Sequence, residues 1–349
     1  MISMDSMLML KIGTDCSGID APIFALRLLG VKYHHAFSSD IDKDCRCVIK
    51  ANSNPDELYH NMQGRDMQQM PRVDIYVCGF PCQPFSNMNC QKTSSDKRRT
   101  VFESVFEYIE SKRPSIFILE NVRNLLSMDD GRIFERIMKD LNSLDYNITH
   151  SVLNSKNFGV PHSRTRLWIV GIRQCKQRVK FQWPTYIACK VAAIDLIEPV
   201  YNDDLSKEVS QYYVKALIRM NVPRTHIGLI EFCQLTMRKR PHTKGNCDVT
   251  KDELEKLCPR TICPCLVRHD PGIYVNHLHR YITGREALSL QGFPKSFKYP
   301  NSSNEWNKKI RKMCGNSMTV HVLASIMSSA LKSIGHVGGK PVTAMNMST

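Results

Sequence analysis

Short apolar runs alternate with amphipathic segments through the first half of this chain. The runs expected to form strands are 7–13, 33–39, 73–78, 115–119, 148–153 and 167–172. The segments expected to form helices are 22–29, a segment ending near 112, and 130–144. Strands separated by helices are typical of a mainly parallel sheet, which binds ligands beyond the carboxyl ends of its strands. The sequence therefore predicts an α/β fold with its site at that rim.

A stiff loop follows the third expected strand. Residues 79–86 read Gly-Phe-Pro-Cys-Gln-Pro-Phe-Ser, so one cysteine stands between two prolines. Each proline restricts its own φ and keeps the residue before it out of the helical region. The loop therefore holds Cys82 just beyond a strand end, where it is a candidate nucleophile. The alternative is a buried structural thiol, since free cysteine often behaves as a small core residue.

The turn after the first expected strand, at 14–20, has the small residues of a nucleotide-binding unit. Gly18 would let the backbone approach a ligand closely. Asp40 ends the second expected strand, and an acid about 20 residues past such a glycine commonly binds ribose hydroxyls. A solvated turn acid or a helix cap is the alternative for Asp40. Asp66 is open to the same two interpretations.

Two further strand ends carry charged side chains. Glu120 follows the fourth expected strand, on the same rim as Cys82, which makes the two plausible partners. Alone, Glu120 could equally be a helix-cap acid. Arg164 and Arg166 precede the last expected strand, and their period-2 spacing predicts that they share one face of an extended segment. Two such guanidiniums could bind a carbonyl or a phosphate, or form an edge-strand charge pair.

The charge balance indicates a polyanionic partner. The chain has 349 residues and a formal net charge of +15. This charge favours nucleic acid first and an anionic membrane second, although solubility alone can account for it. No apolar run is long enough to cross a bilayer, so we expect no membrane partner.

Cysteine usage bears on the compartment and on metal binding. The 14 cysteines are scattered rather than spaced as a secreted disulfide framework. We therefore expect an intracellular protein with reduced thiols, cytoplasmic or nuclear depending on the host. Cys258, Cys263, Cys265 and His269 lack a paired Cys-x-x-Cys, and we expect no metal site.

The alternation of strands and helices fades between residues 174 and 279. Basic residues become frequent there, as at Arg238, Lys239 and Arg240. We interpret this region as a second, smaller domain. The expected division is 1–173 and 280–334 for the main domain, 174–279 for the smaller one, and 335–349 for a flexible tail.

Two helices are expected within the last part of the main domain. Thr283 and Glu286 have the spacing of a capping box, in which the two residues satisfy each other's backbone donors. An apolar helix is predicted over 319–334, just after Gly315, Asn316 and Ser317.

Six blocks of this sequence resemble the DNA cytosine-C5 methyltransferase family, in the family's order and over nearly the whole chain. They are the turn at 15–18, Pro81-Cys82-Gln83, Glu120-Asn121-Val122, Gly159-Val160-Pro161 with Arg164 and Arg166, 280–294, and Gly315-Asn316-Ser317. The resemblance implies a Rossmann-like S-adenosylmethionine-dependent methyltransferase domain, with a smaller, irregular target recognition domain at 174–279. It also implies S-adenosylmethionine as methyl donor and double-stranded DNA as partner, and we expect a monomer.

The resemblance also implies roles for single residues. Cys82 would attack C6 of cytosine, Glu120 would contact N3 and the amino group, and Arg166 would contact O2 with Arg164 nearby. The target base must leave the duplex to reach such a pocket. In the recognition domain, Thr261 would pack beside the displaced base, while the basic run would contact phosphates. The implied members of that basic run are Arg238, Lys239 and Arg240.

For the cofactor, the resemblance points to two stretches of the chain. Asp40 would bind the ribose, Ile41 would lie against adenine, and Asp66 would lie near the adenine amino group. The full implied set is Gly18, Ile19, Asp40, Ile41, Asp66, Asn316 and Ser317.

Three positions depart from the family pattern. Cys16 replaces an aromatic residue, and Asp20 and Arg99 each replace a glycine. We expect Cys16 and Asp20 to lower cofactor affinity, because stacking on adenine is lost and an acid comes near the site. Three other functions stay open: a transfer RNA or other RNA cytosine-C5 methyltransferase, a catalytically weak DNA-binding regulator, and a nicotinamide-dependent oxidoreductase. The last does not explain the Pro-Cys loop, Glu120 or the arginines.

Overall fold

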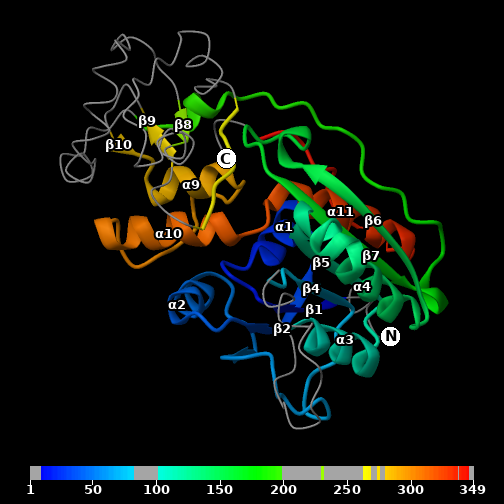
Figure 1. Cartoon of the computed structure of the whole chain (residues 1–349). Coiled ribbons are helices and arrows are strands. Elements are labelled where there is room, and N and C mark those ends of the chain that lie inside the picture. Colours follow the sequence, from blue (N-terminus) through cyan, green and yellow to red (C-terminus); the bar gives the residue numbers. More distant parts are fainter. Residues whose placement is uncertain are drawn as a thin grey trace, which may run out of the picture. The chain divides into compact units, whose positions relative to one another are not determined.

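The computed structural model describes residues 9–81, 101–198, 229–231, 262–268, 273–275, 280–336 and 338–345 (Figure 1). The chain divides into two compact units, each assembled from separate segments. The first unit contains Met1–Asn154, Thr165–Tyr186 and Ser317–Val342. The second contains Ser155–Arg164, Ile187–Asn316 and Thr343–Thr349. Several predicted site residues lie outside the described residues, namely Cys82, Arg238, Lys239, Arg240 and Thr261.

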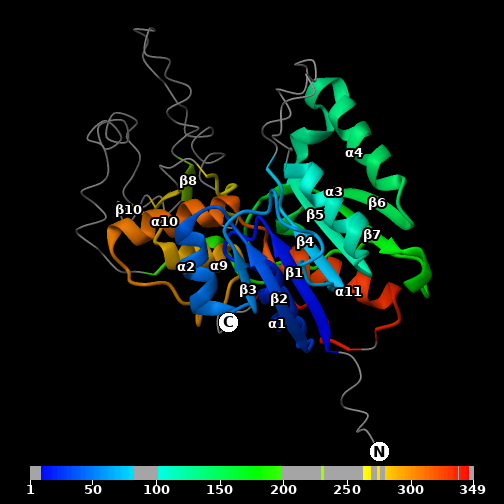
Figure 2. The same cartoon turned by 90° about the horizontal axis from the view of Figure 1, so that it is seen from below.

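A seven-stranded sheet forms the centre of the first unit, in the order β3-β2-β1-β4-β5-β7-β6 (Figure 2). Its strands are β1 (Leu10–Asp15), β2 (Tyr33–Ser39), β3 (Glu57–Tyr59), β4 (Ile75–Cys78), β5 (Ile116–Val122), β6 (Tyr146–Asn154) and β7 (Thr165–Arg173). β1 to β5 are parallel, which confirms the predicted α/β fold and places their carboxyl ends at one rim. β7 is antiparallel to both β5 and β6, so the sheet is mixed where continued parallel alternation was expected.

The helices of the first unit match the predictions closely. They are α1 (Ala21–Leu29), α2 (Lys43–Asn52), α3 (Val101–Lys112), α4 (Arg132–Asn142) and α11 (Val320–Ser333), with the short 3-10 helices η3 (Arg123–Leu126), η4 (Met128–Gly131) and η6 (Gln174–Lys176). α1 has Pro22 in its first turn and ends at Gly30, whose φ of 64° lets its N–H bond the last carbonyls. α2 was not expected. Among the described helices, none has the length and apolar composition that a membrane crossing requires.

Two aromatic rings in the sheet lie over glycines of the neighbouring strand. Gly13 pairs with Phe37, and a Cβ added to Gly13 would lie 2.1 Å from the Phe37 ring. Gly171 pairs with Phe117 in the same way, again with 2.1 Å to the ring. Both rings are fully buried. Any side chain at either glycine would therefore push a ring off the sheet.

The second unit contains a three-stranded antiparallel sheet in the order β10-β9-β8. Its elements are β8 (Leu229–Glu231), β9 (Ile273–Val275), β10 (Arg280–Tyr281), α9 (Gly284–Leu290), α10 (Asn304–Asn316), η5 (Ser155–Asn157) and η7 (Ala193–Leu196). The capping box of α9 is confirmed: Glu286 N donates to Thr283 Oγ1 at 3.1 Å, and Thr283 N donates to Glu286 Oε2 at 2.7 Å. Glu286 also binds Arg280 at 2.8 and 2.9 Å, and both side chains are buried.

The segments of the two units differ from the expected division. Residues 280–316 belong to the second unit, and the return to the first unit comes at Ser317 rather than at 280. Ser155–Arg164, the connection between β6 and β7, also belongs to the second unit. The periodicity of apolar residues predicts whether a segment is a helix or a strand. It does not predict which helices and strands pack together, and that packing decides the unit to which a segment belongs.

The described part of the expected loose tail is anchored. Lys340 N donates to Leu29 O at 2.6 Å, and Met345 N donates to Gly159 O at 2.9 Å. Ala344 and Met345 are buried. Backbone pairing and apolar burial therefore hold the chain past residue 335, where a flexible tail was expected.

His321 makes the stability of the first unit depend on pH. It lies on α11 with 5% of its surface exposed, and burial lowers the pKa of its imidazole to about 4. The unfolded chain takes up the proton nearer pH 6.5, so it binds more protons than the folded chain between these values. The contribution of neutral, buried His321 is therefore lost as pH falls from about 6.5 towards 4.

We expect His321→Gln, which cannot titrate, to reduce this loss. Between about pH 7 and about pH 4.5, the variant should lose on the order of 2 kcal/mol less free energy of unfolding than wild type. Urea unfolding at the two pH values measures this difference. The exposed histidine variant His150→Gln is the control and should keep the wild-type pH dependence. Equal losses in wild type and His321→Gln would contradict the prediction.

Candidate active site

Glu120 and Arg166 form an ion pair between neighbouring strands. Glu120 lies in β5 and Arg166 in β7, with Arg166 Nε 3.1 Å from Glu120 Oε1. Their side chains are 8% and 15% exposed, so water screens the pair only in part. Glu120 was expected to follow the strand but lies within it. The strand is longer than expected because β7 stays paired with β5 as far as Val122.

The base of the Pro-Cys loop lies beside the same carboxylate. Asn121 Nδ2 donates a hydrogen bond of 2.9 Å to Phe80 O, and the Phe80 side chain is buried. A Cβ added to Gly79 would lie 3.6 Å from Glu120 Oε2. The residues just before Cys82 are therefore fixed beside Glu120. Cys82 itself lies outside the described residues.

The turn after β1 is bound to the carboxylate of Asp40. Gly18 N donates to Asp40 Oδ2 at 2.7 Å, and Asp42 N donates to Oδ1 at 2.9 Å. Burial raises the pKa of the Asp40 carboxyl above its usual range, while the two backbone donors act in the opposite direction. Each carboxylate oxygen keeps a further acceptor site. Asp40 can therefore hold the turn and still accept hydrogen bonds from a ligand's hydroxyls.

Two isoleucines predicted for the cofactor site differ in exposure. Ile41, next to Asp40, is 72% exposed, whereas Ile19 is 1% exposed. The exposed branched side chain of Ile41 therefore leaves an apolar surface beside Asp40. Ile19 instead packs in the core, where its side chain supports the turn from within.

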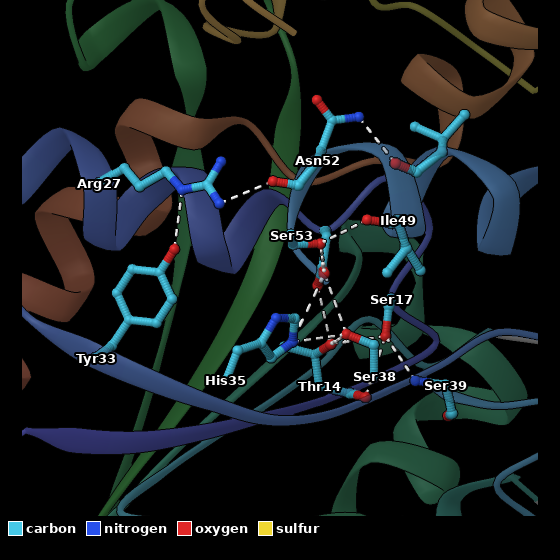
Figure 3. A network of polar contacts seen from close by, with 12 residues as sticks. Thr14, Ser17, Arg27, Tyr33, His35, Ser38, Ser39, Ile49, Asn52 and Ser53 are labelled. Carbon is cyan, nitrogen blue, oxygen red and sulfur yellow. Dashed lines mark hydrogen bonds and ion pairs between the residues drawn. The ribbon is translucent and has the colours of Figure 1, made fainter. Parts of the chain in front are cut away.

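Asp20 faces a buried network of hydroxyl groups. Figure 3 shows Thr14, Ser38, Ser53 and His35 turned towards one another in this network, and three of their hydroxyl groups donate to Asp20. Thr14 Oγ1 donates to Asp20 Oδ1 at 3.0 Å, and Ser38 Oγ and Ser53 Oγ donate to Oδ2 at 3.1 and 2.7 Å. Asp20 is fully buried. This carboxylate therefore presents no exposed charge at the surface of the turn, and its expected effect on cofactor affinity stays a prediction.

The other predicted cofactor residues occupy varied settings. Asp66 is exposed and accepts hydrogen bonds from Gln68 N at 2.8 Å and Gln69 Nε2 at 3.1 Å. Ser317 is buried, whereas Asn316 is exposed at the end of α10. Asn316 and Arg164 belong to the second unit. The first unit brings together Gly18, Ile19, Asp40, Ile41, Asp66, Glu120, Arg166 and Ser317.

Sequence analysis missed Arg65, which binds Asp15 through two guanidinium nitrogens. No local pattern marks an isolated basic residue in a loop as the partner of an acid so far away in the chain.

For metals, no cluster of three or more His, Cys, Asp or Glu able to hold an ion occurs in the part of the chain that the structure describes. Cys258 and His269 lie outside that part.

A family model described as C-5 cytosine-specific DNA methylase matches residues 16–332. The chain belongs to this family. It is accordingly an enzyme of the DNA cytosine-5 methyltransferase class, which confirms the resemblance. Type II methyltransferase M1.ScrFI of Lactococcus lactis subsp. cremoris is 32% identical over 307 residues, covering 86% of this chain and 74% of that protein. Type II methyltransferase M.NgoBI of Neisseria gonorrhoeae is 30% identical over 292 residues, covering 83% of each.

Solved structures confirm the fold of this methyltransferase. The S. pombe Dnmt2 methyltransferase has a TM-score of 0.65 at 18% identity, covering 93% of this chain and 98% of that one. A putative DNA modification methyltransferase encoded within an E. coli prophage has a TM-score of 0.62 at 18% identity, covering 93% and 99%. The predicted Rossmann-like methyltransferase fold is therefore shown.

The two arginines of this methyltransferase have different partners. Arg164 precedes β7 and is 3% exposed, and its Nη1 donates to Leu266 O at 2.9 Å. Arg166 lies in β7 and contacts Glu120. Arg164 supports the described segment 262–268, which follows Thr261.

The segment 262–268 is bound to the connection between β6 and β7 at several further points. Leu266 N donates to His162 Nε2 at 3.1 Å, and Cys263 N donates to Pro161 O at 2.7 Å. On the other side, Gly315 of α10 lies against its backbone. A Cβ added to Gly315 would lie 2.3 Å from the carbonyl carbon of Val267. Close approach of a helix to this segment therefore requires glycine at that position.

We expect Gly315→Ala to displace the segment 262–268. The added Cβ cannot be relieved by a flexible side chain, because backbone atoms surround it. The expected loss of stability is about 1–3 kcal/mol, as for other overpacked sites. Hydrogen exchange should also speed up at the amides of Cys263 and Leu266. The control is Lys312→Ala, at an exposed position of the same helix. Unchanged hydrogen exchange in Gly315→Ala would show that the segment 262–268 accommodates the added methyl group without being displaced.

Proposed function

We propose that this enzyme transfers a methyl group from S-adenosylmethionine to C5 of cytosine in double-stranded DNA, through a covalent bond between Cys82 and C6 of a base turned out of the duplex. The observation that carries the proposal is the Glu120–Arg166 ion pair beside the base of the Pro-Cys loop. Attack at C6 needs an acid and a cation around the ring as well as a thiolate, and this geometry supplies the first two.

The chain's own groups can carry the proposed reaction without a metal ion. Cytosine C5 is a poor nucleophile, and addition of the Cys82 thiolate at C6 moves an electron pair to C5. Glu120 would share a proton with N3 as charge builds on the ring, and Arg166 would contact O2. After methylation, removal of the C5 proton by a base breaks the Cys82–C6 bond and restores the thiolate. The target cytosine must leave the base stack of the duplex before Cys82 can attack it.

The residues at the ends of β1 and β2 fit a methyl donor that carries adenosine. When bound, S-adenosylmethionine would supply an electrophilic methyl group. Asp40, already oriented by Gly18 N, would accept hydrogen bonds from its ribose, and the exposed Ile41 would lie against its adenine. Asp66 would lie near the adenine amino group, with Ser317 and Asn316 towards the methionine end.

We further propose that residues 174–279 choose the target sequence. The charge of +15 suits a polyanion. Thr261 would pack beside the opened base step, and the described segment that follows it is held by Arg164. Arg238, Lys239 and Arg240 would bind phosphates. The curated relatives described above are named as Type II methyltransferases, which favours DNA over RNA as the substrate.

Covalent trapping tests the proposed nucleophile. With a duplex pool containing 5-fluorocytosine and with S-adenosylmethionine, we expect wild type to form a complex that survives denaturing electrophoresis, because fluorine cannot leave as a proton does. Cys82→Ser should form none and should show no methyl transfer. Cys47→Ser, at an exposed free cysteine, is the matched control and should trap like wild type. A fluorinated RNA pool run in parallel should give no trapping. Trapping by Cys82→Ser would show that another group attacks the base.

Loss of the acid tests the role of Glu120. We expect Glu120→Gln to lower the methylation rate at saturating methyl donor by about a hundredfold or more, the usual scale for an acid catalyst. Duplex binding should change much less. Glu110→Gln removes the same charge at an exposed position of α3 and should keep the wild-type rate. A normal rate in Glu120→Gln would reduce Glu120 to a structural partner of Arg166.

A further inference from the structure

A buried ion pair joins the two loops that carry the proposed cofactor contacts. Asp15 ends β1, directly before the turn that contains Gly18. Arg65 directly precedes Asp66. Arg65 Nη1 donates to Asp15 Oδ1 at 2.9 Å and Nη2 to Oδ2 at 2.6 Å, so both oxygens are engaged. The side chains of Arg65 and Asp15 are 7% and 0% exposed.

The carboxylate of Asp15 is fixed from both neighbouring strands. Tyr76 Oη, on β4, donates to Asp15 Oδ2 at 2.8 Å, and Ser39 Oγ, on β2, donates to Oδ1. Since β1 lies between β2 and β4, the acceptor for Arg65 is tied to three strands of the sheet. The position of this carboxylate is therefore set by the core and not by the loops.

The guanidinium of Arg65 is held on its faces as well as along its edge. Its central carbon lies 5.3 Å from the centre of the Tyr59 ring and 5.6 Å from that of Phe37. A planar fork that lies over rings and is bound in bidentate fashion has little freedom, and lysine has no planar group with which to reproduce the bidentate contact. The backbone at residue 65 cannot shift without breaking these contacts.

A buried pair of this kind adds little net stability compared with apolar side chains, because both charges lose their water. Its effect is geometric. Asp66 is exposed, and the described hydrogen bonds to its carboxylate come from Gln68 and Gln69 in its own loop. The pairing of Arg65, one residue earlier, connects this loop to the end of β1, directly before the turn that contains Gly18.

We propose that Arg65 is a positioning residue for the methyl-donor site, acting through Asp15 to hold Asp66 where it recognises the adenine amino group. The proposal rests on the proposed function, since it takes adenine as the ring that Asp66 meets. The ligand class is a purine nucleoside with an exocyclic amino donor. Arg65 itself makes no contact with the ligand.

Calorimetric binding of two nucleosides tests the proposal. S-adenosylhomocysteine carries the amino group, and S-inosylhomocysteine has a carbonyl oxygen in its place. We expect wild type to prefer the adenosyl compound by about tenfold or more, as for other sites built to accept a hydrogen bond. Arg65→Lys keeps the charge but loses the fork, and it should reduce this preference to about that of Asp66→Ala. In an Asp66→Ala background, Arg65→Lys should have no further effect on the preference.

Controls separate positioning from general destabilisation. Arg280→Lys disrupts a second buried bidentate pair, with Glu286, in the second unit. It should lower the unfolding temperature and leave the adenosyl preference unchanged. Tyr76→Phe removes one donor to Asp15 and keeps Arg65, and it should reduce the preference by a few-fold. It serves as the test if Arg65→Lys does not fold.

The binding preferences of these variants decide whether Arg65 positions Asp66. A wild-type preference in Arg65→Lys, or in Tyr76→Phe where that variant is the test, would overturn the positioning role while leaving the proposed function intact. A loss of preference in Arg280→Lys would show that destabilisation alone explains the effect. If wild type binds neither nucleoside, the proposed function fails and the inference fails with it.

Discussion

The register between β5 and β7 sets the geometry on which the candidate site depends. Glu120 is paired with Trp168, and Arg166 is paired with Val122. Residues on such a diagonal share one face and come within reach of long side chains, so Arg166 spans the diagonal to Glu120. A slip of one residue would turn Arg166 to the other face. The ring of Phe117 opposes this slip, because it fits where Gly171 leaves room.

The turn after β1 has a comparable constraint in its backbone. Cys16, Gly18 and Asp20 have φ values of 48°, 56° and 63°, all in the left-handed region. For a residue other than glycine this conformation costs about 1–2 kcal/mol. Buried carboxylates stand at both ends of the turn: Asp15 is bound by Arg65, and Asp20 is bound by three hydroxyl groups. These contacts offset the strain and leave Gly18 N aimed at Asp40.

A structural feature could be predicted from the sequence where neighbouring residues in the chain determine it. The strand at 33–39 was predicted with its observed bounds, and the α9 capping box was predicted from Thr283 and Glu286. The end of β5 was not predicted, because its pairing with β7, a strand much later in the chain, decides how far β5 continues. Arg65 was missed for the same reason, since its partner Asp15 lies far away in the chain, on β1. The roles of Cys82 and Thr261 stay predictions.

Arg164 and Arg166 show how one short stretch of sequence can serve two purposes. Arg166 belongs to the first unit and holds the proposed catalytic acid, whereas Arg164 belongs to the second and holds Leu266 O. Thr165, where β7 begins, separates them. Antiparallel pairing fixes the strand from Thr165 onward, so its start fixes where the connection to β6 can end. The connection between β6 and β7 therefore ends at Arg164, the residue that holds Leu266 O, directly before the strand that carries Arg166.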